Sequence, residues 1–192
     1  DRITRIWDLS SRTEWMASPP QHQQVRSLAF SRDSRLVGIG FADGMVEVRD
    51  ASTRRVLGSV QAHKAQARDM VFFPGNTLMA TTGWDGNVVL WELPGFRIVG
   101  RTGSRGDPLA LTSDGKRLAA GGSGGLKLWN PLGQLELGEL ETGGVGAVQA
   151  AFLPEDETLV VAGVRAVTAL RAPSLHEIDK QVASHARHER NK

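Results

Sequence analysis

The sequence predicts an all-β fold built from repeated four-stranded antiparallel sheets. One pattern recurs along the 192 residues, and the residues that close successive copies of it are 42, 42, 38 and 41 positions apart. Within each unit, short apolar runs of strand length are separated by residues that favour turns. Helical spacing is absent before the last residues, so strands account for the fold.

Four segments share this frame and begin at Val25, Ala67, Gly106 and Ala147, and a partial unit, "ITRIWD", precedes them. The closing positions are Trp7, Arg49, Trp91, Trp129 and Leu170. A period near 40 residues is typical of an array in which each repeat forms one small sheet.

The unit that starts at Ala67 shows how the strands are expected to lie. Its apolar runs predict strands over 67–73, 77–83, 87–93 and 96–100. The strings "FPGN" and "WDGN" between them contain the glycine, proline and asparagine that tight turns require. In the other units "SRDS", "TSDGK" and "PEDE" take the place of "FPGN".

These repeats resemble the WD-repeat β-propeller family. The resemblance rests on "RIWDL", "GWDGNVVLWEL" and "LTSDGKRLAAGGSGGLKLWN", which keep an Asp-Gly turn or a strand closing on Trp. It weakens where Arg49 replaces the closing Trp and where Val164 and Arg165 replace the Asp-Gly turn. The family implies a β-propeller of four-stranded antiparallel blades over residues 1–179, followed by a polar, basic tail over 180–192.

The chain supplies about four and a half blades, whereas closed propellers commonly have four to eight. The partial first unit would leave open sheet edges, which are prone to pair with other chains. We therefore expect the chain to be part of a larger propeller, with the remaining blades upstream. A partner subunit that completes the ring is the alternative.

The family pattern implies a buried polar network in one blade: His63 before the first strand, Thr81 on the second, Asp85 in the turn and Trp91 on the third. Buried indole and hydroxyl groups need hydrogen-bond partners, and an imidazole can link a hydroxyl to a carboxylate. Only this unit keeps all four residue types.

Thr81, His63 and Asp85 are also the residue types of a nucleophile, a base and an orienting acid. In the propeller frame, however, the hydroxyl faces Trp91 rather than an open cleft. We therefore expect a structural network and no catalytic residue. His185 and His188 lie in the polar tail without carboxylates at metal-ligand spacing, so neither a metal site nor a cofactor is expected.

Trp84 directly precedes the turn aspartate, which places it on a loop outside the register that buries Trp91. In propellers of this family, that position and the start of each first strand form a contact surface on the top face. The frame assigns Trp84, Arg68, Arg26, Gln66, Arg105 and Asp107 to this surface, with Gln24, Ala42 and Ser123 at matching places. Arginine and tryptophan are common interface anchors, so we hypothesise that this surface binds an acidic or phosphorylated peptide. The alternative is that the arginines are ordinary surface charges and that Trp84 packs over a neighbouring loop.

Composition narrows the partner classes. The net charge is +2, and four of the 23 Lys and Arg residues, but one of the 21 Asp and Glu residues, lie from Lys180 onward. The body is therefore nearly neutral, and a nucleic-acid partner is not expected. No apolar run is long enough for a membrane span, and the absence of cysteine fits a reducing compartment, so we expect a cytoplasmic protein without a membrane partner.

The function predicted from the sequence is a noncatalytic scaffold that binds a protein or peptide on its top face. The first alternative is a sensor or targeting domain of a larger multidomain enzyme, with a kinase or protease upstream. The second is a propeller hydrolase or lyase. An upstream nucleotide-binding motif would favour the former, and an open central cleft with acid and base residues would favour the latter.

Overall fold

The computed structural model describes residues 5–17, 23–103, 108–121, 125–133, 135–142, 147–163 and 166–171. Over these ranges the chain forms antiparallel strands and a single turn of 3₁₀ helix, η1 (Pro74–Asn76), which confirms the all-β prediction. The predicted tail over 180–192 lies outside the described residues.

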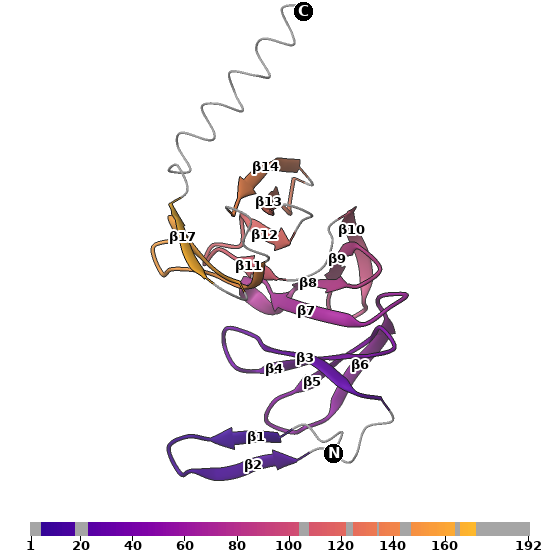
Figure 1. Ribbon diagram of the computed structural model, residues 1–192. Helices are drawn as coiled ribbons and strands as arrows, with labels where there is room; N and C mark the ends of the chain where they lie inside the picture. Colours follow the sequence, from indigo (N-terminus) through magenta and orange to yellow (C-terminus); the bar gives the residue numbers. More distant parts are fainter. Residues whose placement is uncertain are drawn as a thin grey trace, which may run out of the picture.

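The strands form five sheets in chain order, each a meander in which neighbours in sequence pair (Figure 1). The first is the hairpin β1 (Arg5–Asp8) and β2 (Thr13–Ala17). The second sheet contains β3 (Val25–Phe30), β4 (Leu36–Phe41), β5 (Met45–Asp50) and β6 (Val56–Gln61). The third contains β7 (Ala67–Phe72), β8 (Leu78–Gly83), β9 (Asn87–Glu92) and β10 (Arg97–Gly103).

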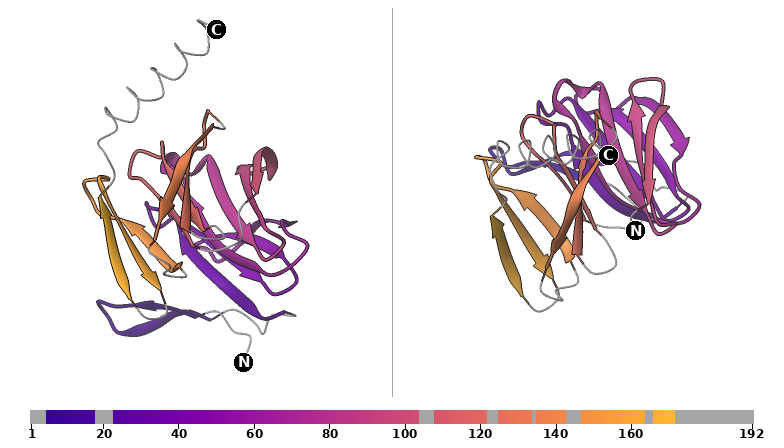
Figure 2. Two further views of the ribbon diagram at one scale, coloured as in Figure 1. Left: turned by 45° about the horizontal axis from the view of Figure 1, so that its top comes forward. Right: turned by 90° about the horizontal axis from the view of Figure 1, so that it is seen from above.

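The fourth sheet contains β11 (Leu109–Leu111), β12 (Leu118–Gly121), β13 (Gly125–Asn130) and β14 (Leu135–Glu141). The fifth contains β15 (Ala147–Phe152), β16 (Thr158–Gly163) and β17 (Val167–Arg171). Among the described residues, the predicted four and a half blades are therefore three four-stranded blades, one of three strands and one of two. Successive sheets lie face to face as β-propeller blades do (Figure 2).

Side chains along the third strand of a blade alternate between its two faces, and both faces contribute to the core, as β9 shows. On β9, Val89 and Trp91 face the preceding blade and pack with Val46 and Val48. The alternate residues Val88 and Leu90 face the following blade and pack with Leu118 and Ala120. Because successive side chains on a strand point to opposite faces, one strand serves two interfaces. This explains why the runs are nearly continuously apolar rather than alternating.

The turns between the first two strands of each blade define the bottom face of the molecule. Each predicted turn string places a residue at positive φ at the same point of the unit: Ser34, Asn76, Gly115 and Asp156. In the second of these turns Gly75 also has positive φ. Neighbouring turns are joined, because Asn76 donates to the carboxylate of Asp33 and Ser113 donates to that of Asp156. The first strands of these blades are also in contact, β3 with β7, β7 with β11 and β11 with β15.

Candidate partner-binding site on the top face

A buried chain of hydrogen bonds crosses the β7–β10 blade. The Nε1 atom of Trp91 donates to Oγ1 of Thr81 over 2.9 Å, and the same oxygen lies 2.9 Å from Nε2 of His63. Nδ1 of His63 lies 3.0 Å from Oδ1 of Asp85. The structure thus brings together the four side chains that the family pattern assigned to one network.

The direction of the hydrogen bonds follows from the chemistry of the groups. Indole can only donate, so Thr81 accepts from Trp91 and its one hydroxyl proton goes to Nε2 of His63. Nε2 is then an acceptor, which leaves Nδ1–H to donate to Asp85. His63 is therefore a neutral imidazole in a defined tautomer.

Burial supports this protonation state. His63 is almost fully enclosed, and desolvation lowers the pKa of its imidazole below the ordinary 6.5, although the Asp85 carboxylate acts in the opposite direction. Burial by itself would raise the pKa of Asp85, but the hydrogen bonds from the Lys64 N–H and from the His63 imidazole hold it below its usual value. At neutral pH the pair is an imidazole beside a carboxylate.

Asp85 also shapes the turn that carries Trp84. Its carboxylate accepts from the backbone N–H groups of Lys64 and Asn87, at 3.0 and 3.2 Å. Gly83 lies against the imidazole, where an added Cβ would come within 2.5 Å of Cγ of His63. The buried network therefore fixes the backbone on both sides of Trp84.

Trp84 itself is presented to solvent. Its backbone N–H donates to the backbone carbonyl of Gln66 over 3.0 Å, while 61% of the residue is exposed. The guanidinium carbon of Arg68 lies 4.9 Å from the centre of the indole ring, which is a cation–π contact. Trp84 and Arg68 form an ordered pair of an aromatic ring and a cation, called the Trp84–Arg68 pair below.

A β-bulge places Arg68 beside the ring. The pairing of β7 with β8 shifts between Ala67 and Asp69, so Arg68 is the extra residue. The same shift occurs around Arg26 on β3, which is exposed at the matching place of the preceding blade. Val148 is the bulged residue of β15. In each of these three strands the bulge falls at the second residue, a feature that sequence periodicity does not reveal.

The remaining residues assigned to this surface are placed as follows. Gln66 is half-buried, and its Oε1 has no hydrogen-bond donor among the described residues. Ala42 donates its N–H to the carbonyl of Gln24, as Trp84 does to Gln66 one blade later. Arg105, Asp107 and Ser123 lie outside the described residues. The top face is defined here by residues 24–26, 42–44, 62–68 and 84–86.

The other blades replace the network rather than repeat it. In the β3–β6 blade, Ile39 and Arg49 stand at the places of Thr81 and Trp91, and Arg49 instead donates to the half-buried carboxylate of Glu47. In the β11–β14 blade, Ala120 takes the place of Thr81. The indole Nε1 of Trp129 there is buried and has no acceptor among the described residues.

Sequence reasoning missed Asp69. Its carboxylate accepts from the N–H of Leu109 over 2.8 Å and so joins β7 to β11, the innermost strand of the next blade. The available signal was an aspartate inside an otherwise buried strand, because a charge in that position requires a partner.

The geometry limits the chemistry that this network can perform. Thr81 is fully buried and bonded to both Trp91 and His63, so a substrate cannot reach its hydroxyl. Within the described ranges, no group of three or more His, Asp or Glu side chains could hold a metal ion. Over the same ranges, no helix has the length and apolar character needed to cross a membrane.

Comparison with known proteins agrees with this architecture. Residues 2–87 match the family model described as the anaphase-promoting complex subunit 4 WD40 domain. WD repeat-containing protein 36 of Homo sapiens is 30% identical over 63 residues, which are 33% of this chain and 7% of that protein. A guanine nucleotide-binding protein subunit beta of Schizosaccharomyces pombe is 28% identical over 96 residues, which are 50% of this chain and 31% of that protein.

The fold and the buried network define a propeller built from repeated blades. With the matches above, the chain is similar to proteins of the WD-repeat family. It spans less than a third of the length of either relative. The matches support a propeller of the protein-interaction kind in general terms.

Proposed function

We propose that this chain is a noncatalytic interaction scaffold that binds a protein segment on its top face, with the Trp84–Arg68 pair as anchor. The single observation that carries the proposal is the exposure of a large aromatic ring in a rigid setting. Trp84 is 61% exposed, yet its backbone is fixed by Gln66 and by the Asp85 turn. Rigid, exposed aromatic residues lose little entropy on binding and are frequent hot spots.

The chemistry of the pair favours an acidic or phosphorylated segment. A guanidinium can direct two parallel N–H donors at a carboxylate or phosphate, and the indole offers a flat apolar surface beside it. Arg26, exposed at the matching bulge of the preceding blade, adds a second cation on this face. A negatively charged group flanked by an apolar residue satisfies both halves of the site.

The test uses three peptide libraries of identical design, centred on phosphoserine, glutamate or serine. We expect selective binding from the phosphoserine or glutamate library, lost in Trp84→Ala and Arg68→Ala and weakened at high salt. Trp7→Ala is the matched control, since Trp7 is 54% exposed on β1, and Arg97→Ala is the control for the cation. Equal binding by the two top-face variants and the controls would place the contact elsewhere.

A sensor or targeting domain of a larger enzyme remains the second candidate, because the matched relatives extend well beyond the region shared with this chain. In that case the same top face would deliver an attached enzyme to its target.

A further inference from the structure

A groove of about 280 Å³ lies between the β3–β6 and β7–β10 blades, beside the bottom turns and the outermost strands, and we call it the lower groove. The first blade lines it with Leu36, Val48 and Leu57, and the second with Asn76, Thr77, Leu93, Pro94 and Phe96. Most of this wall is apolar. Both blades are complete, and all eight lining residues are among those that the structure describes.

The wall of the lower groove is held by the packing of the two blades. Phe96 packs edge to face on the buried Trp91, with ring centres 6.4 Å apart. The Phe96 ring also lies over Gly58, where an added Cβ would come within 2.6 Å of its Cε2. Leu57 is the extra residue of a β-bulge between β5 and β6, and 45% of it is exposed. The groove therefore combines a packed wall with an accessible leucine.

The rim on the β3–β6 blade carries a free cation. Leu36 pairs with Asp50, and the backbone N–H of Asp50 donates to the carbonyl of Arg55 over 2.9 Å. Because residues directly opposite on neighbouring strands share a face, Arg55 lies on the same side of the blade as Leu36. Arg55 is exposed, and within the described ranges its guanidinium makes no hydrogen bond or ion pair.

Two aspartates lie at the same end of this blade, and both are bound to groups of the turns. The amide of Asn76 donates to Asp33, and the N–H and hydroxyl of Thr53 donate to Asp50. These bonds lower the pKa of each carboxyl to about 2. Asp33 also lies 3.7 Å from Arg35. The turns over 31–36 and 50–55 carry four arginines against these two aspartates: Arg32, Arg35, Arg54 and Arg55.

The opposite rim is uncharged. Residues 74–77 and 93–96 of the β7–β10 blade contain no charged side chain. The flanking charges, Glu92 and Arg97, bind each other. The lower groove thus has one cationic rim and one neutral rim, which favours an anionic ligand over a cationic one.

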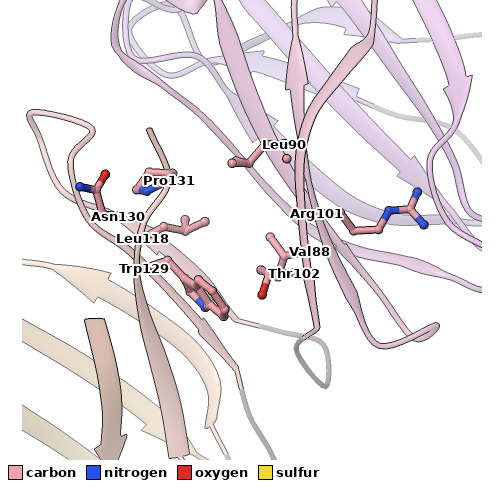
Figure 3. A pocket seen from close by; sticks show the side chains of 9 residues that line it. Val88, Leu90, Arg101, Thr102, Leu118, Trp129, Asn130 and Pro131 are labelled. Atoms are coloured by element: carbon pink, nitrogen blue, oxygen red, sulfur yellow. The ribbon is translucent and has the colours of Figure 1, made fainter. Parts of the chain in front are cut away.

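The following interface does not repeat this arrangement. The space between the β7–β10 and β11–β14 blades is about 90 Å³, and polar or charged residues enter its lining (Figure 3): Arg101, Thr102 and Asn130. Of these two spaces, the lower groove is the larger and the more apolar.

We propose that the lower groove binds a segment of a partner protein in which a large apolar side chain stands next to a glutamate or aspartate. The apolar side chain lies between Leu57 and Phe96, and the carboxylate pairs with Arg55. The groove lies beside the bottom turns and shares no residue with the Trp84–Arg68 pair. The chain can therefore hold a second partner independently of the top face.

The test uses four peptide libraries of one design, with Leu-Glu, Leu-Gln, Ser-Glu or Ser-Gln at the centre, each in both orders. The binding chain carries Trp84→Ala and Arg68→Ala, so that the top face does not contribute. We expect the Leu-Glu library to bind about tenfold more tightly than the other three, and to bind less tightly at high salt. Equal binding of all four libraries, or no binding, would overturn the proposal whatever the result at the top face.

Two substitutions separate the two halves of the site. Arg55→Gln should remove the preference for Leu-Glu over Leu-Gln, and Leu57→Ser should weaken binding of both. The matched controls are Arg12→Gln and Leu132→Ser, at exposed positions of other turns. If the Arg55 variant keeps the preference for glutamate, or if the controls have the same effects, the peptide binds outside the lower groove.

Thr77→Trp places a ring in the lower groove from the opposite blade and should abolish binding of the Leu-Glu peptides. Other occupants give different results. A second copy of the chain would appear as a dimer in analytical ultracentrifugation that Thr77→Trp dissociates. An anionic membrane would appear as binding to phosphatidylserine vesicles that Arg55→Gln removes. Either result in place of peptide binding would overturn the proposal.

Discussion

Thr81 and Trp91 are linked by a 2.9 Å hydrogen bond that ends a continuous path from the blade core to the top face. His63 and Asp85 continue the path to the turn on which Trp84 is exposed. The two tryptophans of "GWDGNVVLWEL" therefore have different environments, one buried in the network and one in contact with solvent. The buried ring helps to hold the turn that presents the exposed ring.

Thr81→Val should lower the free energy of unfolding by about 1–3 kcal/mol, because it removes the acceptor of Trp91 and the donor to His63 while preserving shape. The measurement is urea denaturation followed by tryptophan fluorescence. Thr77→Val, at an exposed position of the same blade, is the control and should change stability little. A similar loss in both variants would argue against the network.

Ala120→Thr should be more stable than Ala120→Val, by about 1 kcal/mol, because only threonine gives the buried indole of Trp129 an acceptor. The two side chains have nearly the same shape, so steric strain at this fully buried site affects both. Thermal denaturation of the pair measures the difference. Equal stability of the two variants would show that position 120 cannot reproduce the Thr81 bond.

Stability should fall as the pH is lowered from about 6.5. Burial lowers the pKa of His63 in the folded chain, so below 6.5 the unfolded chain takes up a proton that the folded chain does not. The contribution of His63 is fully present above pH 6.5 and is lost as the pH falls toward the lowered pKa. The lowered pKa of Asp85 acts in the same direction below about pH 4.

The pH dependence is measured by urea denaturation at a series of pH values. His63→Gln should remove the decline that begins near pH 6.5 and leave the decline at lower pH. If His63→Gln retains the full slope between pH 5 and 6.5, other groups cause it.

Phe96→Ala should cost about 2 kcal/mol, less than the 3–5 kcal/mol of a fully buried phenylalanine because the ring is half-buried. The loss comes from its packing on Gly58 and Trp91. Ile98→Ala, two residues later on β10, where the side chain is exposed, is the control in the denaturation experiment. If both changes cost the same, Phe96 does not fill the interface as described.

The sequence by itself determined the all-β class, the repeat and the approximate strands. The period of about 40 residues and the turn strings are local features, and each turn needs only its own residues to adopt positive φ. The residue types of the network in the β7–β10 blade could also be recognised, because Thr81, His63, Asp85 and Trp91 stand at the places that the family pattern requires.

Only the tertiary structure decided how the blades meet. The bulge that turns Arg68 toward Trp84, the bond from Asp69 to the next blade and the cavity of about 90 Å³ between the β7–β10 and β11–β14 blades all depend on register between segments far apart in the chain. Apolar periodicity tells which face of a strand is buried but not how closely two buried faces fit. Whether a glycine such as Gly58 or Gly100 faces a ring or a cavity is therefore settled by packing alone.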